Sequence, residues 1–234
     1  MELNLESNVT QTNISGIDSS IASISLSQKQ KHTFISLQEI QIFFHSDHIY
    51  NDSNMKDVIL ILYSTLILAE NDESCEDFSC VCRHIDAIVA AYLEIALPLG
   101  LVLKVIGELV KNDMNCMKLG NVCLHVASAL MMFNYSTLMI SICARTIKKL
   151  VNSNINPIQI YAVCPHLPCL LNIHIEDETT VYLILDVILE LTQKDPICRE
   201  LICVSPIIPI IRLIYSDNVI ILNKMLQVAK QIII

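Results

Sequence analysis

A tetrapeptide of the pattern Val-Cys-x-His recurs along this chain at a fixed interval. It begins at Val81, Val122 and Val163, so the two intervals are equal: 122 − 81 = 41 and 163 − 122 = 41. A further step of the same length reaches Val204, which begins a related segment, Val-Ser-Pro-Ile. A period of about 20 to 50 residues is typical of folds in which similar units stack and bury each other's apolar faces.

Apolar residues at helical spacing follow the same interval. The stripe Leu103, Ile106, Leu109 and Val110 has the i, i+3 and i+7 pattern of an amphipathic helix. The sets at successive steps of this interval are Ala144, Ile147, Leu150 and Val151; Leu185, Ile188, Leu191 and Thr192; and Leu226, Ala229, Ile232 and Ile233. We therefore predict one amphipathic helix in each unit, with each of these sets forming its apolar stripe.

The repeat predicts an all-α fold with about five units. Five steps of the interval place the repeats in residues 31–234. The predicted units are 31–72, 73–113, 114–154, 155–195 and 196–234. Residues 1–30 are rich in Ser and Asn and poor in aromatic residues, and we predict that they form a flexible polar tail.

Parts of the repeat resemble the armadillo family. Residues 163–171 and 204–211 are similar to the start of the second helix of an armadillo repeat, and residues 178–192 to its long third helix. The resemblance is strongest in the two C-terminal units and weakest in the first, and HEAT repeats are close relatives of similar length. It implies a right-handed α-solenoid that is not an enzyme: a scaffold or adaptor that binds a peptide or helix in a concave groove, in the cytoplasm or nucleus.

The resemblance also indicates where a partner would bind. In peptide-binding armadillo proteins, Asn and Trp recur on the third helices, and the Trp lies one turn before the Asn. The Asn positions correspond here to Glu108, Lys149, Glu190 and Gln231. The chain has no Trp, so we do not expect it to bind nuclear-import cargo in the manner of the import receptors.

Charged pairs replace the Trp and Asn residues. Residues four apart lie on one helix face, and along the units these pairs change from mixed to basic to acidic to uncharged. We predict that this face binds a protein partner of alternating charge; the alternative is an ordinary solvated face. The predicted partner-binding residues are Lys104, Glu108, Ser141, Arg145, Lys149, Tyr182, Asp186, Glu190, Asn223 and Gln227.

The cysteines and histidines permit a metal or thiol chemistry as an alternative. Cys75, Cys80, Cys82 and His84 can supply four ligands to tetrahedral zinc, and Cys82 with His84 can form a nucleophile and base. However, Cys82 and His84 recur in the next two units, and a position that repeats in this way is typical of packing. Neighbouring units lie about 10 Å apart, too far for disulfides between equivalent cysteines. We expect no catalytic site, metal or cofactor, and expect the recurring His to satisfy backbone groups.

Composition removes several other classes of function. The net charge of 15 − 24 = −9 gives no basic surface for nucleic acid, and four glycines form no phosphate-binding loop. The mean hydropathy is +0.53, and residues 119–144 contain no Asp, Glu, Lys or Arg. A helical membrane-associated protein is therefore the main alternative to the scaffold. Residues 1–30 resemble no signal peptide, which favours a reducing compartment.

The last helix predicted by the repeat is unusually apolar. Residues 228–234 end in Ile232, Ile233 and Ile234. Repeat proteins usually cover such a face with a polar capping unit, and an uncovered one is typical of an interface. Three interpretations remain open: a fragment or isoform of a longer repeat protein, a dimer, or a partner that caps this end.

Overall fold

The computed structural model describes residues 35–45, 50–72, 75, 78–119, 121–153 and 156–232. Every regular element among these residues is a helix, so the predicted all-α class is confirmed for this part of the chain. From Ser36 onwards the helices belong to one compact unit, Ser36–Ile234. The predicted tail, residues 1–30, lies outside the described residues.

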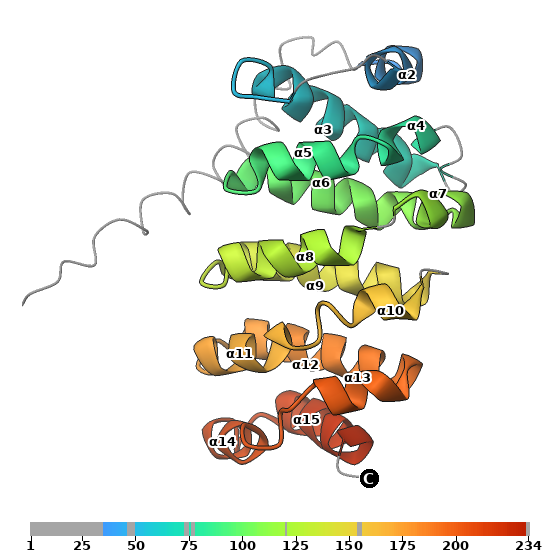
Figure 1. Ribbon diagram of the computed structural model, residues 1–234. Helices are drawn as coiled ribbons and strands as arrows, with labels where there is room; N and C mark the ends of the chain where they lie inside the picture. The colour runs from blue at the N-terminus through green and yellow to red at the C-terminus, as the bar shows by residue number, and fades with distance from the viewer. Residues whose placement is uncertain are drawn as a thin grey trace, which may run out of the picture. The chain divides into compact units, whose positions relative to one another are not determined.

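Five longer helices begin at a constant interval. They are α3 (Met55–Asn71), α6 (Ala96–Leu109), α9 (Thr137–Asn152), α12 (Glu178–Lys194) and α15 (Val219–Ile232). Each begins one sequence period after the previous one, since 96 − 55, 137 − 96, 178 − 137 and 219 − 178 all equal 41. Each also packs against the next, so that the five helices lie in a row within the unit (Figure 1). The period of the sequence is therefore also a period of helix packing.

Shorter helices precede the first long helix or lie between successive long ones. They are α2 (Leu37–His45), α4 (Ser79–Cys82), α5 (Ile85–Tyr92), α7 (Asp113–Lys118), α8 (Val122–Met132), α10 (Pro157–Ile160), α11 (His166–Ile173), α13 (Pro196–Leu201) and α14 (Ile208–Ile214). Helices α5, α8, α11 and α14 each pack on the long helix that follows them. Figure 1 shows the resulting pairs in successive layers.

Polar caps at the same interval explain where three of the long helices begin. Ser136, Asp177 and Asn218 lie one residue before α9, α12 and α15. Their side-chain oxygens accept backbone N–H groups of the first turn, at 3.3 Å for Ser136 Oγ and 3.1 Å for Asp177 Oδ1 and Asn218 Oδ1. Such caps satisfy N–H groups that have no partner within the helix. The equivalent residue before α6 is Ile95, whose side chain cannot cap.

The predicted apolar stripes form the core between the long helices. The first three sets are buried, and Leu103, Ile106 and Leu185 are 0% exposed. The fourth set is less buried, since Leu226 is 51% exposed, and the last long helix therefore has an exposed apolar residue at this position. Its equivalents in α9 and α12 are covered by the next long helix, and within the described residues no further helix packs on α15 in that way.

Side chains from one unit also bond to backbone carbonyls of the unit before. His174 Nε2 lies 2.6 Å from Asn134 O, and Tyr215 Oη donates to Ile175 O at 3.0 Å. The two residues of the second contact each lie one period after the corresponding residue of the first, since 215 − 174 = 41 and 175 − 134 = 41. The equivalent residue in the preceding unit is Phe133, which has no group to donate. The repeat is therefore preserved in polar contacts as well as in apolar packing.

Helix α6 approaches α9 closely at two glycines. A Cβ atom at Gly100 would lie 3.3 Å from Ile142 Cδ1, and one at Gly107 would lie 3.2 Å from Lys149 Cδ. Both distances are shorter than ordinary contacts of a Cβ atom, so the two glycines let side chains of α9 lie directly on α6.

The segment considered as a membrane span is not one helix. Residues 119–144 contain α8, the non-helical residues 133–136 and the first half of α9. Among the described residues, no helix combines the length and the apolar character needed to cross a bilayer.

Candidate functional site

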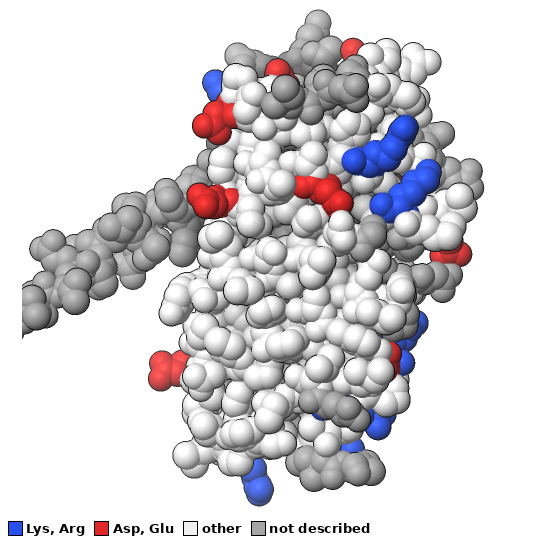
Figure 2. Space-filling view, in the orientation of Figure 1, with Lys and Arg blue, Asp and Glu red and all other residues white. Residues whose placement is uncertain are grey.

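Charged side chains are unevenly distributed over the described residues of the compact unit Ser36–Ile234. Helices α8 and α11 contain no Asp, Glu, Lys or Arg. The side of the unit formed by α8, α11 and α14 is accordingly almost uncharged in Figure 2. The long helices α9 and α12 do carry charged side chains, and partner-binding residues are predicted there.

The ten predicted residues belong to α6, α9, α12 and α15, and we call them together the long-helix surface. Arg145, Lys149, Asn223 and Gln227 are exposed; Lys104, Ser141, Tyr182, Asp186 and Glu190 are half-buried; Glu108 is buried. Ion pairs between helices connect several of these residues to one another and to lysines that the sequence analysis did not select. They form two clusters.

The first cluster consists of Glu108, Lys111 and Lys149. Lys111 Nζ lies 2.6 Å from Glu108 Oε2, and Lys149 Nζ of α9 bonds to Glu108 Oε1. The Glu108 side chain is 8% exposed, whereas Lys111 and Lys149 are 36% and 44% exposed. Burial raises the pKa of Glu108, but the two ammonium groups outweigh it, and the pKa lies below its usual value. Glu108 is therefore an ionised carboxylate with two lysines between it and the solvent.

The second cluster consists of Lys148, Asp186, Glu190 and Lys224. Lys224 Nζ of α15 lies 2.6 Å from Asp186 Oδ1, and Lys148 Nζ of α9 bonds to Asp186 Oδ2 and lies 3.0 Å from Glu190 Oε1. Burial raises the pKa of Asp186, but hydrogen bonds from both lysines lower it by more than burial raises it. The pKa of Asp186 therefore lies below its usual value. Lys224 also lies 5.4 Å from the centre of the Tyr182 ring. This cluster connects the three helices α9, α12 and α15.

Sequence reasoning missed Lys111, Lys148 and Lys224. The two pairs that Asp186 makes in the second cluster have the same separation, since 186 − 148 = 38 and 224 − 186 = 38. This separation is about one helical turn shorter than the sequence period. Each pair therefore joins positions on neighbouring helices that are offset by about one turn. Opposite charges at this separation are the signal that could have found Lys148 and Lys224, whereas Lys111 lies three residues after its partner Glu108. Lys148 and Lys224 neutralise the carboxylates of Asp186 and Glu190. The acidic face predicted on α12 is therefore already paired within the chain.

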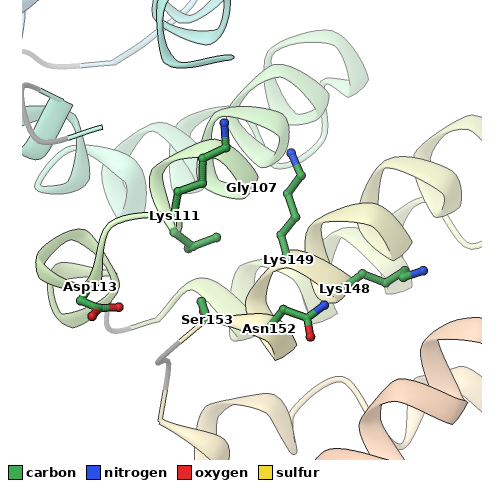
Figure 3. A pocket seen from close by; sticks show the side chains of 8 residues that line it. Gly107, Lys111, Asp113, Lys148, Lys149, Asn152 and Ser153 are labelled. Atoms are coloured by element: carbon green, nitrogen blue, oxygen red, sulfur yellow. The ribbon is translucent and has the colours of Figure 1, made fainter. Parts of the chain in front are cut away.

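A cavity of about 350 Å³ opens between α6 and α9 beside the first cluster. Its lining residues are Gly107, Val110, Lys111, Asp113, Lys148, Lys149, Asn152 and Ser153. Figure 3 shows the side chains of Lys111 and Lys149 ending near Gly107, with Asp113 on the other side of the cavity and Lys148 directed away. The end of the cavity near Gly107 is therefore positively charged, and it can accept an anionic group.

The recurring cysteines are packing positions, as predicted. Cys82, Cys123 and Cys164 are 4%, 1% and 0% exposed. Burial raises the pKa of Cys123 to about 12 and also raises the pKa of Cys80. A raised pKa reduces the thiolate fraction that nucleophilic chemistry requires.

The proposed zinc ligands do not form a metal site. No group of three or more His, Cys, Asp or Glu side chains among the described residues lies close enough to hold an ion. Both ring nitrogens of His84 have other partners: Nδ1 lies 2.7 Å from Tyr50 Oη, and Nε2 lies 2.7 Å from Phe44 O.

The repeated histidines differ in what they bind. His84 does satisfy a backbone carbonyl, as predicted. The prediction is wrong for His125, whose Nε2 lies 2.7 Å from the Asp86 carboxylate of the preceding unit. The same residue type at the same position in the repeat can therefore have different partners.

No family model, curated protein or solved structure matches this chain. The resemblance to armadillo repeats therefore stays a prediction from the residues that carry it. What the protein does must be argued from the long-helix surface, the two ion-pair clusters and the cavity.

Proposed function

We propose that this protein is a protein-interaction scaffold or adaptor, not an enzyme, built as a right-handed armadillo-like α-solenoid of about five units. Three observations support the proposal: the long helices begin at a constant interval, each packs on the next, and polar contacts between units recur at the same interval. Units of this kind expose a continuous surface along their stack, which suits an extended partner.

The partner is a peptide or a helix that binds along the long-helix surface. The observation that carries this proposal is the cavity between α6 and α9, which three lysines line and which lies on the same helices as exposed Arg145 and half-buried Lys104. Neither of these side chains takes part in the two ion-pair clusters. They can therefore contact a partner without loss of an ion pair of either cluster. We place the protein in the cytoplasm or nucleus because its described cysteine side chains are free thiols, as in a reducing compartment.

Charge reversal on this surface tests the proposal. Proteins captured by tagged wild-type chain, Arg145→Glu and Arg83→Glu are compared by quantitative mass spectrometry. Arg83 is exposed at the end of α4, outside the long-helix surface, and its reversal changes the net charge equally. We expect a set of partners that Arg145→Glu loses and Arg83→Glu keeps, each with affinity lowered by about tenfold or more. Equal capture by all three chains would contradict the proposed surface.

The exposed apolar face of α14 and α15 is a second candidate interface. Leu213, Ile220 and Leu226 are 79%, 67% and 51% exposed, and the equivalents of Leu226 in earlier units are buried by a neighbouring helix. We propose that a helix packs here, from a second copy or a capping partner. Leu226→Glu should shift a concentration-dependent dimer to monomer in light scattering; an unchanged molar mass would exclude the second copy.

A further inference from the structure

The Glu108 cluster carries an excess of positive charge at the mouth of the cavity. Two ammonium groups share one carboxylate, which leaves 2 − 1 = +1 within the cluster. The carboxylate is 8% exposed, while the two lysine side chains are 36% and 44% exposed. The negative charge is therefore on the buried side and the positive charge faces the cavity.

The two lysines keep donors for a ligand. An ammonium group has three N–H donors, and each lysine makes one bond to Glu108. Gly107 permits this arrangement, because a Cβ atom there would lie 3.2 Å from Lys149 Cδ and 3.9 Å from Lys149 Nζ. The missing side chain lets Lys149 lie along the edge of the cavity with its ammonium group near that of Lys111 (Figure 3).

The arrangement of the other polar groups makes the end of the cavity near Gly107 the place where an anion can bind. Lys148 is bound to Asp186 and Glu190, and Ser153 Oγ donates to Leu150 O at 2.7 Å. The carboxylate of Asp113 lies on the other side of the cavity (Figure 3). An anion would therefore bind between Lys111 and Lys149, away from the carboxylate of the lining.

We propose that this cavity binds a single oxyanion, a carboxylate or a phosphate, that the partner peptide presents to Lys111 and Lys149. The inference rests on the proposed function and adds the chemistry by which the partner is recognised. Glu108 acts as an internal competitor, since its carboxylate already occupies one donor of each lysine. The ligand oxyanion gains charge-assisted hydrogen bonds from the remaining donors.

Calorimetric titration at low salt with three probes tests the inference: a hexaglutamate peptide, a phosphoserine peptide of equal length, and inorganic phosphate. We expect Lys149→Gln to weaken binding of both peptides by about fivefold or more, and Glu108→Gln to strengthen it by about threefold. A gain in affinity cannot result from a damaged fold, so the second variant keeps the test valid if the first is destabilised.

Matched controls separate the site from the net charge. Lys56→Gln lies at an exposed position of α3, outside the long-helix surface, and changes the charge as Lys149→Gln does. Exposed Glu94→Gln changes the charge as Glu108→Gln does. The affinity of both control variants for the two peptides should stay within about twofold of that of the wild type. If the site variants behave like their controls, the inference is overturned.

The outcomes also separate this inference from the proposed function. Tight binding of only one of the two peptides would support the site and identify its oxyanion as carboxylate or phosphate. If inorganic phosphate binds as tightly as the phosphopeptide, the oxyanion site stands but peptide recognition fails. If the site variants have no effect while Arg145→Glu still loses partners, the scaffold stands without this site.

Discussion

The Glu108 cluster and the Asp186 cluster both place two lysines around one largely buried carboxylate, but they differ in charge and in the helices that they connect. The Glu108 cluster has a net charge of +1 and makes one connection between helices, from α6 to α9. The Asp186 cluster includes Glu190, so its charge is 2 − 2 = 0, and it connects α9, α12 and α15. Only the first borders the end of the cavity near Gly107.

The difference suggests two roles for one arrangement of side chains. A neutral cluster that is complete within the chain stabilises the stack, because every charge has a partner at short distance. A cluster with an unbalanced charge at its exposed side has bonding capacity left for a ligand. This distinction can be tested by removing each carboxylate in turn.

The largest effect should come from removing Asp186. Asp186→Ala leaves Lys148 and Lys224 without their shared acceptor, and we expect the free energy of unfolding to fall by about 2 kcal/mol. Urea unfolding at pH 7 measures this free energy of unfolding. The control is Asp217→Ala, at an exposed position, which should change the free energy of unfolding by less than about 0.5 kcal/mol. A loss no larger than in the control would remove the stabilising role of this cluster.

The contribution of Asp186 should also depend on pH. The pKa of Asp186 is lowered in the folded protein, so its contribution is present above the unfolded value of about 3.9. It should be lost as the pH falls through the lower folded value. Wild type and Asp186→Asn should therefore differ by about 1 to 2 kcal/mol at pH 7 and converge below about pH 4. A difference that stays constant down to about pH 3 would contradict an ionised Asp186.

Removing the charge of Glu108 should cost less. In Glu108→Gln the two lysines are 36% and 44% exposed and can turn to water, so we expect a loss of about 1 kcal/mol. Urea unfolding beside Asp186→Ala gives the comparison directly. If Glu108→Gln were the more destabilising variant, the roles assigned to the two clusters would have to be exchanged.

The smallest effect should be that of salt. Added sodium chloride screens exposed charges more than buried ones, and the lysines of the Glu108 cluster are the more exposed. Between about 0.05 and 0.5 M salt, the cost of Glu108→Gln should fall by about 0.3 kcal/mol, and that of Asp186→Ala by less. Equal salt dependence would show that exposure does not distinguish the clusters.

The sequence predicts the apolar part of this fold well, for a physical reason. Burial follows the helical period, so the interval that relates Leu103 to Ala144 and Leu185 also locates the buried face of each long helix. The pattern alone does not decide burial at Leu226, because burial there depends on a neighbouring helix and not on the pattern of its own helix. Whether an apolar stripe is covered is a property of the assembly.

The candidate site was predicted less completely. Charges were compared within single helices, where Lys104 and Glu108 are four residues apart, whereas all the observed pairs except Lys111–Glu108 lie between helices. Which lysine reaches a carboxylate depends on the offset of neighbouring helices. That offset is set by packing at positions such as Gly107, which the repeat does not predict. The cavity depends on the same offset and was not anticipated.

The glycines of α6 have a consequence for the order of folding. Each glycine costs a helix interior about 1 kcal/mol relative to alanine, and α6 carries two of them, Gly100 and Gly107. Its first turn also lacks a polar cap, so α6 has little intrinsic tendency to be helical by itself. During synthesis α6 leaves the ribosome before α9, whose side chains fill the space that the glycines leave. Helix α6 also packs on α3, which is synthesised before it, so we expect only the side of α6 that carries the glycines to depend on the docking of α9.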